Sequence, residues 1–316
     1  MLRYTADRRT LAFVAGYYLL LALAYLLPLH WWSTAPLIPA LCLLSFFCAV
    51  ITHNTVHVPI FRNREMNRWF QVALTQTYGH PVSMFVPGHN LSHHRYLQGP
   101  KDRMRTDKMR FDWNLLNQLL FSSVVGGAIF RDNLDYAKAM RTRRPRWFRQ
   151  LMLETTIFIL FMAALLLLDW KKFLLFVFIP HQYAVWGITG VNFVQHEGCD
   201  PEHDYNHSRN FTGRALNWFT FNNGFHGLHH LKPSMHWSVL REQHAALVEP
   251  HVDPRLNLPA LLPYAARAYI WPGKRMRYDG TPVVLGDPRP DEPWVPSALT
   301  TTQDAAAGDL EHGAVG

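Results

Sequence analysis

The chain has 316 residues, of which 49% are apolar and 17% charged, and its formal net charge is +8. Because the apolar residues are concentrated in blocks, the composition argues against an ordinary soluble protein and favours an integral membrane protein. A basic chain can bind nucleic acid, but this one lacks strips of interleaved aromatic and basic residues, and Lys and Arg also accumulate in the cytoplasmic loops of membrane proteins.

Two uncharged runs near the start, residues 11–29 and 35–52, predict a first pair of membrane spans. Each run is about 27 Å long or more as a helix, which is enough to cross a bilayer core. The first run is longer than the apolar region of a signal peptide, and no clear cleavage site follows it. The linker between the runs is short, so we expect a helical hairpin. Arg3, Arg8 and Arg9 place the N-terminus in the cytoplasm.

Residues 53–150 are rich in Arg and Lys, which again indicates the cytoplasmic side. Two partly apolar stretches in this part, residues 69–86 and 111–130, contain Gly, Pro or amide residues. We interpret both as helices that lie on the membrane surface rather than crossing it.

Residues 151–168 and 173–194 predict a second pair of spans, joined by a tight outer turn at residues 169–172. The chain beyond His196 is soluble in character and includes a possible short amphipathic helix at residues 256–270. We expect residues 1–280 to form a single membrane-embedded domain and residues 281–316 to form a disordered tail. With four spans, both termini are cytoplasmic.

The three cysteines, Cys42, Cys48 and Cys199, form neither a disulfide framework nor a CxxC site. Histidine carries a stronger signal, because nine of the eighteen histidines fall in four short groups at the ends of predicted spans or in loops. The spacings are HxxxH, HxxxHH, a single histidine and HxxHH, formed by His53 and His57; His89, His93 and His94; His196; and His226, His229 and His230.

Imidazole is a common ligand for transition metals, and residues three or four apart share one face of a helix. Neighbouring histidines diverge by about 100° on a helix, so such a pair can serve two metals. Nine nitrogens exceed the four of a tetrahedral zinc site. We therefore expect two metal ions, each with several nitrogen ligands and open positions for another molecule.

Ligands of one site must lie on the same side of the membrane. The chain must therefore cross an even number of times between His94 and His196, which the two later spans satisfy. A third span at residues 111–130 would separate the groups.

Two other metal chemistries fit less well. An intramembrane zinc protease needs HExxH, but His196-Glu197 is not followed by the second histidine. Haem ligation would place isolated histidines inside spans, whereas these cluster at span ends. A metal-binding or electron-transfer membrane protein without enzymatic activity remains an alternative.

The residues around the histidine groups are also distinctive. They are Thr52-His53-Asn54-Thr55-Val56-His57, Phe61-Arg62-Asn63, Gly88-His89-Asn90 and Phe225-His226-Gly227-Leu228-His229-His230-Leu231-Lys232-Pro233. Together with Asn192, four residues before His196, these segments resemble the membrane fatty acid desaturase superfamily over residues 46–240. The resemblance and the spans imply an all-α integral membrane fold: four transmembrane helices in two hairpins, interfacial helices and a cytoplasmic histidine-rich cap.

The resemblance implies that two irons, using O2 as co-substrate, are held by the nine histidines, and that Asn192 binds directly or through water. The expected reaction introduces a double bond into a fatty acyl or other lipid chain. A lipid or hydrocarbon hydroxylase on the same scaffold is the alternative, and no catalytic residue beyond the metal ligands is implied. The candidates for orienting the imidazoles are Glu197, Asp200, Asp204, Asn222 and Asn223.

No haem motif, GxGxxG or iron–sulfur cysteine set is present, so the two electrons per turnover must come from a separate ferredoxin, rubredoxin or cytochrome-type donor. Four arginines, Arg141, Arg143, Arg144 and Arg146, are positioned either to attract such an acidic partner or to contact anionic lipid.

Overall fold

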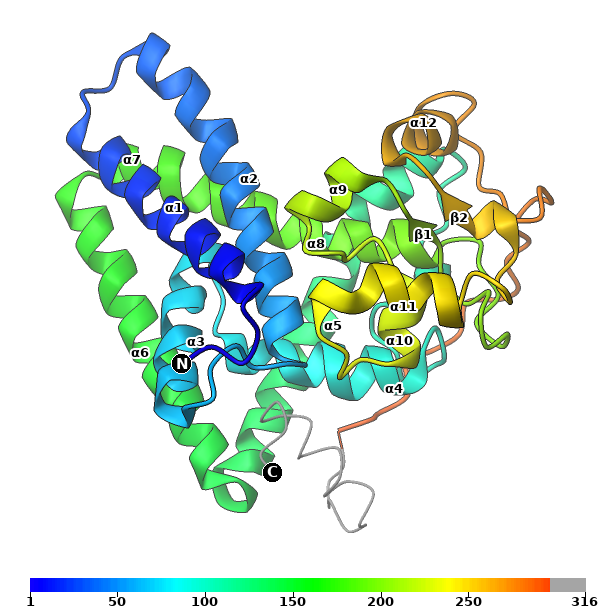
Figure 1. Cartoon of the computed structure of the whole chain (residues 1–316), viewed down its shortest axis with the longest axis horizontal. Coiled ribbons are helices and arrows are strands. Elements are labelled where there is room, and N and C mark those ends of the chain that lie inside the picture. The colour runs from blue at the N-terminus through cyan, green and yellow to red at the C-terminus, as the bar shows by residue number, and fades with distance from the viewer. Residues whose placement is uncertain (296–316) are drawn as a thin grey trace. The chain divides into compact units, whose positions relative to one another are not determined.

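The computed structural model describes residues 1–295, which are mostly helical (Figure 1). They divide into two compact units. The first unit contains Met1–Val86 and Leu134–Ile188, and the second contains Pro87–Asn133 and residues 189–295. Helices α5 (Asn114–Arg143) and α8 (Ile179–His196) each have residues in both units. The single domain predicted for residues 1–280 stays a prediction.

Within residues 1–295, four helical segments are long and apolar enough to cross a membrane, and they confirm the four predicted apolar runs. They are α1 (Asp7–Leu26), α2 (Trp31–Thr55), α6 (Pro145–Leu168), and a segment from Trp170 to His196 that comprises α7 (Trp170–Phe173), η4 (Leu174–Phe178) and α8. Helix α5 is not among them.

The outer surface of α6 shows why these helices suit a bilayer. Leu160, Leu167 and Leu168 are 64%, 86% and 74% exposed. Leaving such large apolar side chains in water forgoes roughly 1.5–3 kcal/mol each relative to burial, a cost that lipid hydrocarbon removes.

In the first unit, α3 (Arg64–Tyr78) packs against α1, α2 and α6. Helix α3 stands where a surface helix was predicted for residues 69–86, but it is shorter and begins earlier. Helix α3 ends at Tyr78 because Gly79, at φ +89°, adopts the left-handed conformation typical of a helix C-terminus. A short 3-10 turn, η1 (Val82–Met84), follows.

Two groups of buried polar residues connect the helices of the first unit. Glu154 of α6 is fully buried and accepts hydrogen bonds from the backbone N–H and hydroxyl of Ser83, at 2.8 and 3.0 Å. His181 Nε2 of α8 lies 3.1 Å from both the Tyr17 hydroxyl and the Gln76 carbonyl oxygen. Buried polar groups that find partners in this way fix how apolar helices pack.

The second unit begins with the π-helix η2 (Pro87–His93), followed by α4 (His94–Tyr96), η3 (Thr106–Lys108) and the first part of α5. After α8 come two short strands, β1 (Asn210–Phe211) and β2 (Asn257–Leu258), which pair in parallel with Asn210 opposite Asn257. The remaining elements are α9 (Arg214–Phe219), α10 (His226–Leu231), η5 (Trp237–Val239), α11 (Leu240–Leu247), η6 (Pro254–Leu256), α12 (Leu261–Ala265) and η7 (Ala266–Ile270).

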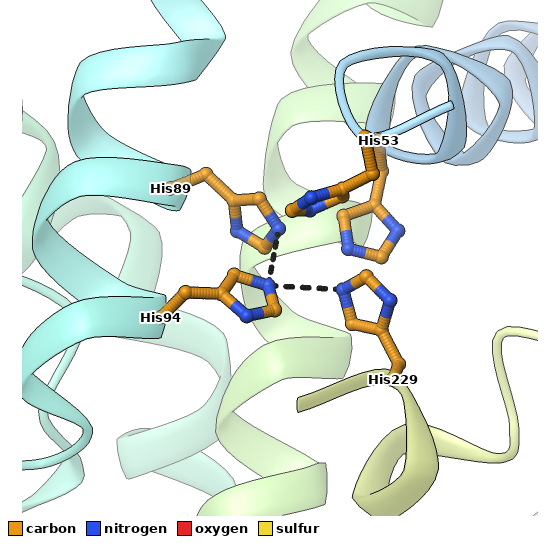
Figure 2. Close-up of side chains that lie close together, drawn as sticks. His53, His89, His94 and His229 are labelled. Atoms are coloured by element: carbon orange, nitrogen blue, oxygen red, sulfur yellow. Dashed lines mark hydrogen bonds between the residues drawn. The ribbon is translucent and has the colours of Figure 1, made fainter. Parts of the chain in front are cut away.

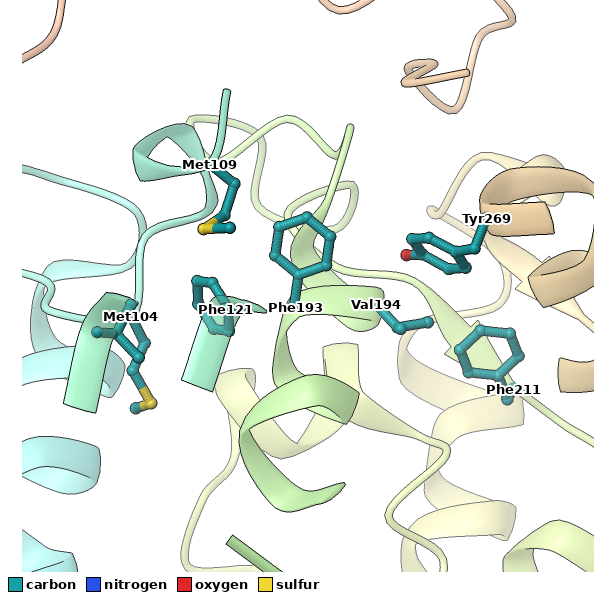
Figure 3. Packing of buried hydrophobic residues seen from close by; sticks show 8 residues of the cluster. Met104, Met109, Phe121, Phe193, Val194, Phe211 and Tyr269 are labelled. Atoms are coloured by element: carbon teal, nitrogen blue, oxygen red, sulfur yellow. The ribbon is translucent and has the colours of Figure 1, made fainter. Parts of the chain in front are cut away.

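A buried apolar cluster in this unit surrounds the last turns of α8 (Figure 3). Phe193 and Val194 pack there with Phe121, Phe211 and Tyr269. The ring centroids of Phe193 and Phe121 are 5.0 Å apart. The cluster anchors the helix end that carries His196.

Two predicted segments differ in extent from the structure. The stretch expected as a surface helix at residues 111–130 belongs to the 30-residue helix α5. The helix expected at residues 256–270 begins only at Leu261, because Asn257 and Leu258 pair with β1 instead.

Residues 281–295 contain no helix, and within them Asp291 pairs with Arg105 at 2.9 Å. The rest of the predicted tail lies outside the described residues.

We predict that Gly79→Ala destabilises the protein. A non-glycine residue in the left-handed conformation costs about 1–2 kcal/mol. The added Cβ would also lie 2.8 Å from the Cβ of His181. A free energy of unfolding lower by about 2 kcal/mol is therefore expected. Thermal unfolding in detergent measures it, with Gly16→Ala as control because no atom lies within 4 Å of that Cβ. Equal midpoints for the two variants would contradict the packing described.

Candidate metal centre

Seven of the nine histidines singled out in the sequence belong to the second unit, where they form two groups of converging side chains. We call His89, His94 and His229 the first histidine group, and His93, His196, His226 and His230 the second. Within each group, one nitrogen from every ring lies within 4.8 Å of the others.

Local backbone structure explains how adjacent residues reach different groups. His93 and His94 belong to different groups, and so do His229 and His230. The π-helix η2 contains His89 and His93, and helix α10 contains His226, His229 and His230. Helical geometry makes neighbouring side chains diverge, as expected from the sequence. π-helical turns are rare and are found preferentially at functional sites.

The second group contains a triangle of nitrogens that hydrogen bonding cannot explain. The Nε2 atoms of His196, His226 and His230 are separated by 2.9, 3.1 and 3.2 Å. A neutral imidazole nitrogen is either a donor or an acceptor, so three mutually close nitrogens can form at most one good hydrogen bond and leave one atom over. Nitrogens about 2.0–2.1 Å from a shared ion at roughly right angles would be about 3 Å apart. The triangle therefore fits a metal ion.

His93 supplies the fourth nitrogen of the second group. Its ring centroid lies 4.8 Å from that of His196 and 4.9 Å from that of His230. Among the described residues, its buried Nε2 has no hydrogen-bond partner. A buried polar atom without a partner is costly unless something binds it, and an imidazole lone pair suits a transition metal.

The first group has a similar arrangement (Figure 2). The His94 Nε2 lies 3.0 Å from the Nε2 of His89 and 2.9 Å from the Nε2 of His229. One imidazole nitrogen makes a single good hydrogen bond, so it cannot satisfy both neighbours in this way. This group too has the donor set of a metal site.

His53 and His57 belong to the first unit and are described within it. His53 lies in the last turn of α2, and His57 follows just beyond the helix end. Both are buried, and their ring centroids are 5.6 Å apart. Burial lowers the pKa of His57 well below its usual value, and His53 lowers it further, so this imidazole is neutral.

Asn192 lies on α8, one turn before His196. Its side chain is buried, and within the described part of the chain its amide nitrogen has no hydrogen-bond partner. The sequence placed Asn192 and His196 on one face, and their spacing on α8 agrees.

The electrostatic environment keeps the ligand nitrogens available. Burial lowers the pKa of His230 well below its usual value, with further lowering by His94 and His226. Only the neutral form of histidine binds a metal, so this shift favours metal binding at physiological pH.

Asp102 and the carbonyl of His207 orient two of the imidazoles. His196 Nδ1 donates to the His207 carbonyl oxygen at 3.1 Å, and His93 Nδ1 donates to the Asp102 carboxylate at 2.9 Å. Asp102 also accepts from the backbone N–H groups of Gln98 and Met104. Burial alone would raise the pKa of Asp102, but His93 and these hydrogen bonds lower it below its usual value. Each Nε2 lone pair therefore faces the group centre.

Sequence reasoning did not find Asp102. It lies nine residues after His93 in a basic segment that also contains Asp107 and Asp112, so nothing in the sequence singles it out. The residues proposed as imidazole acceptors act elsewhere. Glu197 pairs with Arg275, and the Asn222 amide donates to the Trp237 carbonyl oxygen. The backbone carbonyl of Asn223 accepts from Gln195, and among the described residues its buried side-chain oxygen contacts no imidazole through a hydrogen bond. Asp200 accepts from the Glu202 N–H, and Asp204 is exposed.

We predict that Asp102→Ala weakens transition-metal binding by about 10- to 100-fold, because His93 loses the acceptor that orients it. Asp102→Asn keeps a neutral acceptor and should lose less. Titration of the metal-free protein with Co²⁺ measures both. Asp135→Ala is the matched control, since Asp135 forms an exposed pair with Lys138. Unchanged affinity in Asp102→Ala would refute the orienting role.

Known proteins share this sequence pattern. The family model described as fatty acid desaturase matches residues 28–259, which is more than half of the chain. An alkane 1-monooxygenase from Ectopseudomonas oleovorans is 25% identical over 260 residues. That alignment covers 77% of this chain and 63% of the monooxygenase, so the chain spans less than two thirds of that relative. The match confirms the resemblance seen in the histidine groups, and the chain belongs to the fatty acid desaturase family.

Proposed function

We propose that this protein is an O2-dependent di-iron oxidoreductase that introduces a double bond into a fatty acyl or other lipid chain. The Nε2 triangle of His196, His226 and His230 carries the proposal, because it suits a bound metal and not a hydrogen-bond network. The first histidine group, whose nitrogens also converge, and the family membership support two ions rather than one.

Each histidine group would hold one iron. His93, His196, His226 and His230 would bind the second iron, with Asn192 bound directly or through water. His89, His94 and His229 would bind the first, and His53 and His57 would complete the set of nine histidines that the family resemblance assigns to the two irons. The all-nitrogen donor set suits iron among other transition metals. When bound, the irons would supply the oxidising power, drawn from O2, that an unactivated C–H bond requires.

The protein's own residues keep the ligand imidazoles neutral and oriented. Burial lowers the pKa of His57 and of His230 well below the usual value, which favours the neutral form that binds a metal. The Asp102 carboxylate and the His207 carbonyl set the tautomers of His93 and His196 by accepting from Nδ1. The remaining face of each ion would be open to O2 and the lipid chain.

For the membrane, we propose that residues 1–280 act as one domain in which the four spans form two hairpins. The termini and the metal centre would lie on the cytoplasmic side with the interfacial helices. The charge distribution and the even number of crossings between His94 and His196 support this orientation.

A separate ferredoxin, rubredoxin or cytochrome-type protein would supply the electrons. Arg141, Arg143 and Arg146, at the junction of α5 and α6, are exposed and offer positive charge to an acidic partner, with Arg144 beside them. The same charges also suit anionic lipid.

A lipid or hydrocarbon hydroxylase on the same scaffold is the second candidate, and the likeness to an alkane 1-monooxygenase favours it. A metal-binding or electron-transfer protein without enzymatic activity is the third. Mass spectrometry of lipids and alkanes from cells that express the protein separates them. A product lighter by two hydrogens is expected. A product heavier by one oxygen would instead establish the hydroxylase, and the absence of any new product would contradict both enzymatic candidates.

We also predict that His93→Ala and His229→Ala each abolish turnover and each lower bound iron, because they remove a ligand from different groups. Product formation and elemental analysis of the same samples measure the two effects. His251→Ala is the control, since this exposed histidine packs against the Tyr205 ring and belongs to neither histidine group. Full activity in either ligand variant would refute the assignment.

A further inference from the structure

The end of α8, which carries His196, is held by charged side chains from later parts of the chain. Glu197 follows His196 directly and is 1% exposed. Its carboxylate pairs with the Arg275 guanidinium, whose Nη2 lies 2.9 Å from Oε2 and whose Nε donates to Oε1. Both side chains are removed from solvent, so the pair is shielded from screening.

The Arg275 side chain contacts two separate segments of the chain. Besides Glu197, its Nη2 donates to the Thr106 carbonyl oxygen at 2.9 Å and its Nη1 donates to the Met109 carbonyl oxygen. The planar guanidinium has its donors in fixed directions, so it sets the relative positions of these segments in a way that a flexible ammonium does not. The segment from Thr106 to Met109, which contains η3, follows closely after Asp102, which orients His93.

The backbone near Arg275 lies directly against the same helix end. Gly198, at φ +68°, has no Cβ, and a Cβ there would overlap the Met276 carbonyl oxygen. The Tyr278 N–H donates to the Gly198 carbonyl oxygen at 2.9 Å. The segment from Arg275 to Tyr278 is thus seated on the residues that follow His196.

A second arginine caps the helix itself. Arg209 is buried and donates from Nη1 to the carbonyl oxygens of Val194 and Glu197, at 2.8 and 3.0 Å. Its guanidinium lies 4.4 Å from the centre of the Tyr264 ring. The last carbonyls of a helix lack internal partners, so a cation here stabilises the helix end.

We infer that Arg275 is a positioning residue for the second metal site, acting through Glu197 to fix His196. This inference rests on the proposed function. Arg275 lies beyond residue 259, where the match to the family model ends. A ligand set must be held within about 0.5 Å of its working geometry. The Nε2 triangle includes His196, so a shift of this helix end would open that site and leave the first histidine group unaffected.

The test is a Co²⁺ titration of the full-length, metal-free protein in detergent, with visible absorption and elemental analysis as readouts. The variants are Arg275→Met, Arg275→Lys and Arg275→Met combined with Glu197→Gln. His196→Ala shows what loss of the ligand looks like. Arg255→Met is the matched control, because Arg255 pairs with Asp253 in an exposed position.

We expect wild type and Arg255→Met to bind two Co²⁺ per chain. Arg275→Met should keep one site at wild-type affinity and weaken the other by about 10-fold or more, as His196→Ala does. The double variant should also bind Co²⁺ weakly at that site. Removing the uncompensated charge of Glu197 does not restore the position of His196. Arg275→Lys, which keeps the charge but not the fork of donors, should be intermediate.

Wild-type Co²⁺ affinity at both sites of Arg275→Met would overturn the inference. Wild-type affinity at both sites of the double variant would also overturn it, since the effect of Arg275→Met would then come from the unpaired buried charge alone. If Arg275→Met does not fold, wild-type Co²⁺ affinity at the second metal site of Arg275→Lys would overturn the inference equally. Wild-type protein that binds fewer than two ions would instead contradict the proposed function, so the two failures are distinguishable.

Discussion

In the second histidine group, the Nε2 atoms of His196, His226 and His230 lie 2.9–3.2 Å from one another in a buried setting. Each buried polar atom left without a partner costs about 1–3 kcal/mol. The fold therefore concentrates, at one point, an unfavourable arrangement that only a shared ligand relieves. Apparent free energies of about 10–16 kcal/mol for structural metal sites show that an ion can offset such a cost many times over.

Much of the surrounding structure serves to aim these nitrogens. A π-helix spaces His89 and His93, a carboxylate and a carbonyl fix the tautomers of His93 and His196, and an apolar cluster holds the end of α8. His196 is the last residue of the fourth candidate span. The geometry of the proposed metal centre and the insertion of that span into a bilayer are thus linked through one helix. His181, which packs against Gly79, lies earlier in the same span.

The sequence predicted the features that depend on local periodicity. The four apolar runs, the histidine groups and the divergence of His93 from His94 all follow from helix geometry and spacing. It did not predict Asp102 or Arg275, because their roles arise from contacts with residues 9 and 78 positions away. Pairing of β2 with β1 likewise replaced the first turns of a predicted helix at residues 256–270, since a distant strand competes with local propensity.

The same reasoning explains why Glu197 was assigned the wrong partner. Its position beside His196 favoured an imidazole contact, whereas a cation from beyond the family match neutralises it in the fold. Charge compensation of a buried carboxylate outweighs proximity in sequence, because an unpaired buried charge is costly.

The central claim is that the two histidine groups hold two iron ions. Elemental analysis combined with Mössbauer spectroscopy of the purified, full-length protein tests it most directly. Two non-haem irons per chain are expected in distinct nitrogen-rich environments, and one of them should disappear in His93→Ala. A single iron, a haem spectrum or zinc alone in active protein would contradict it.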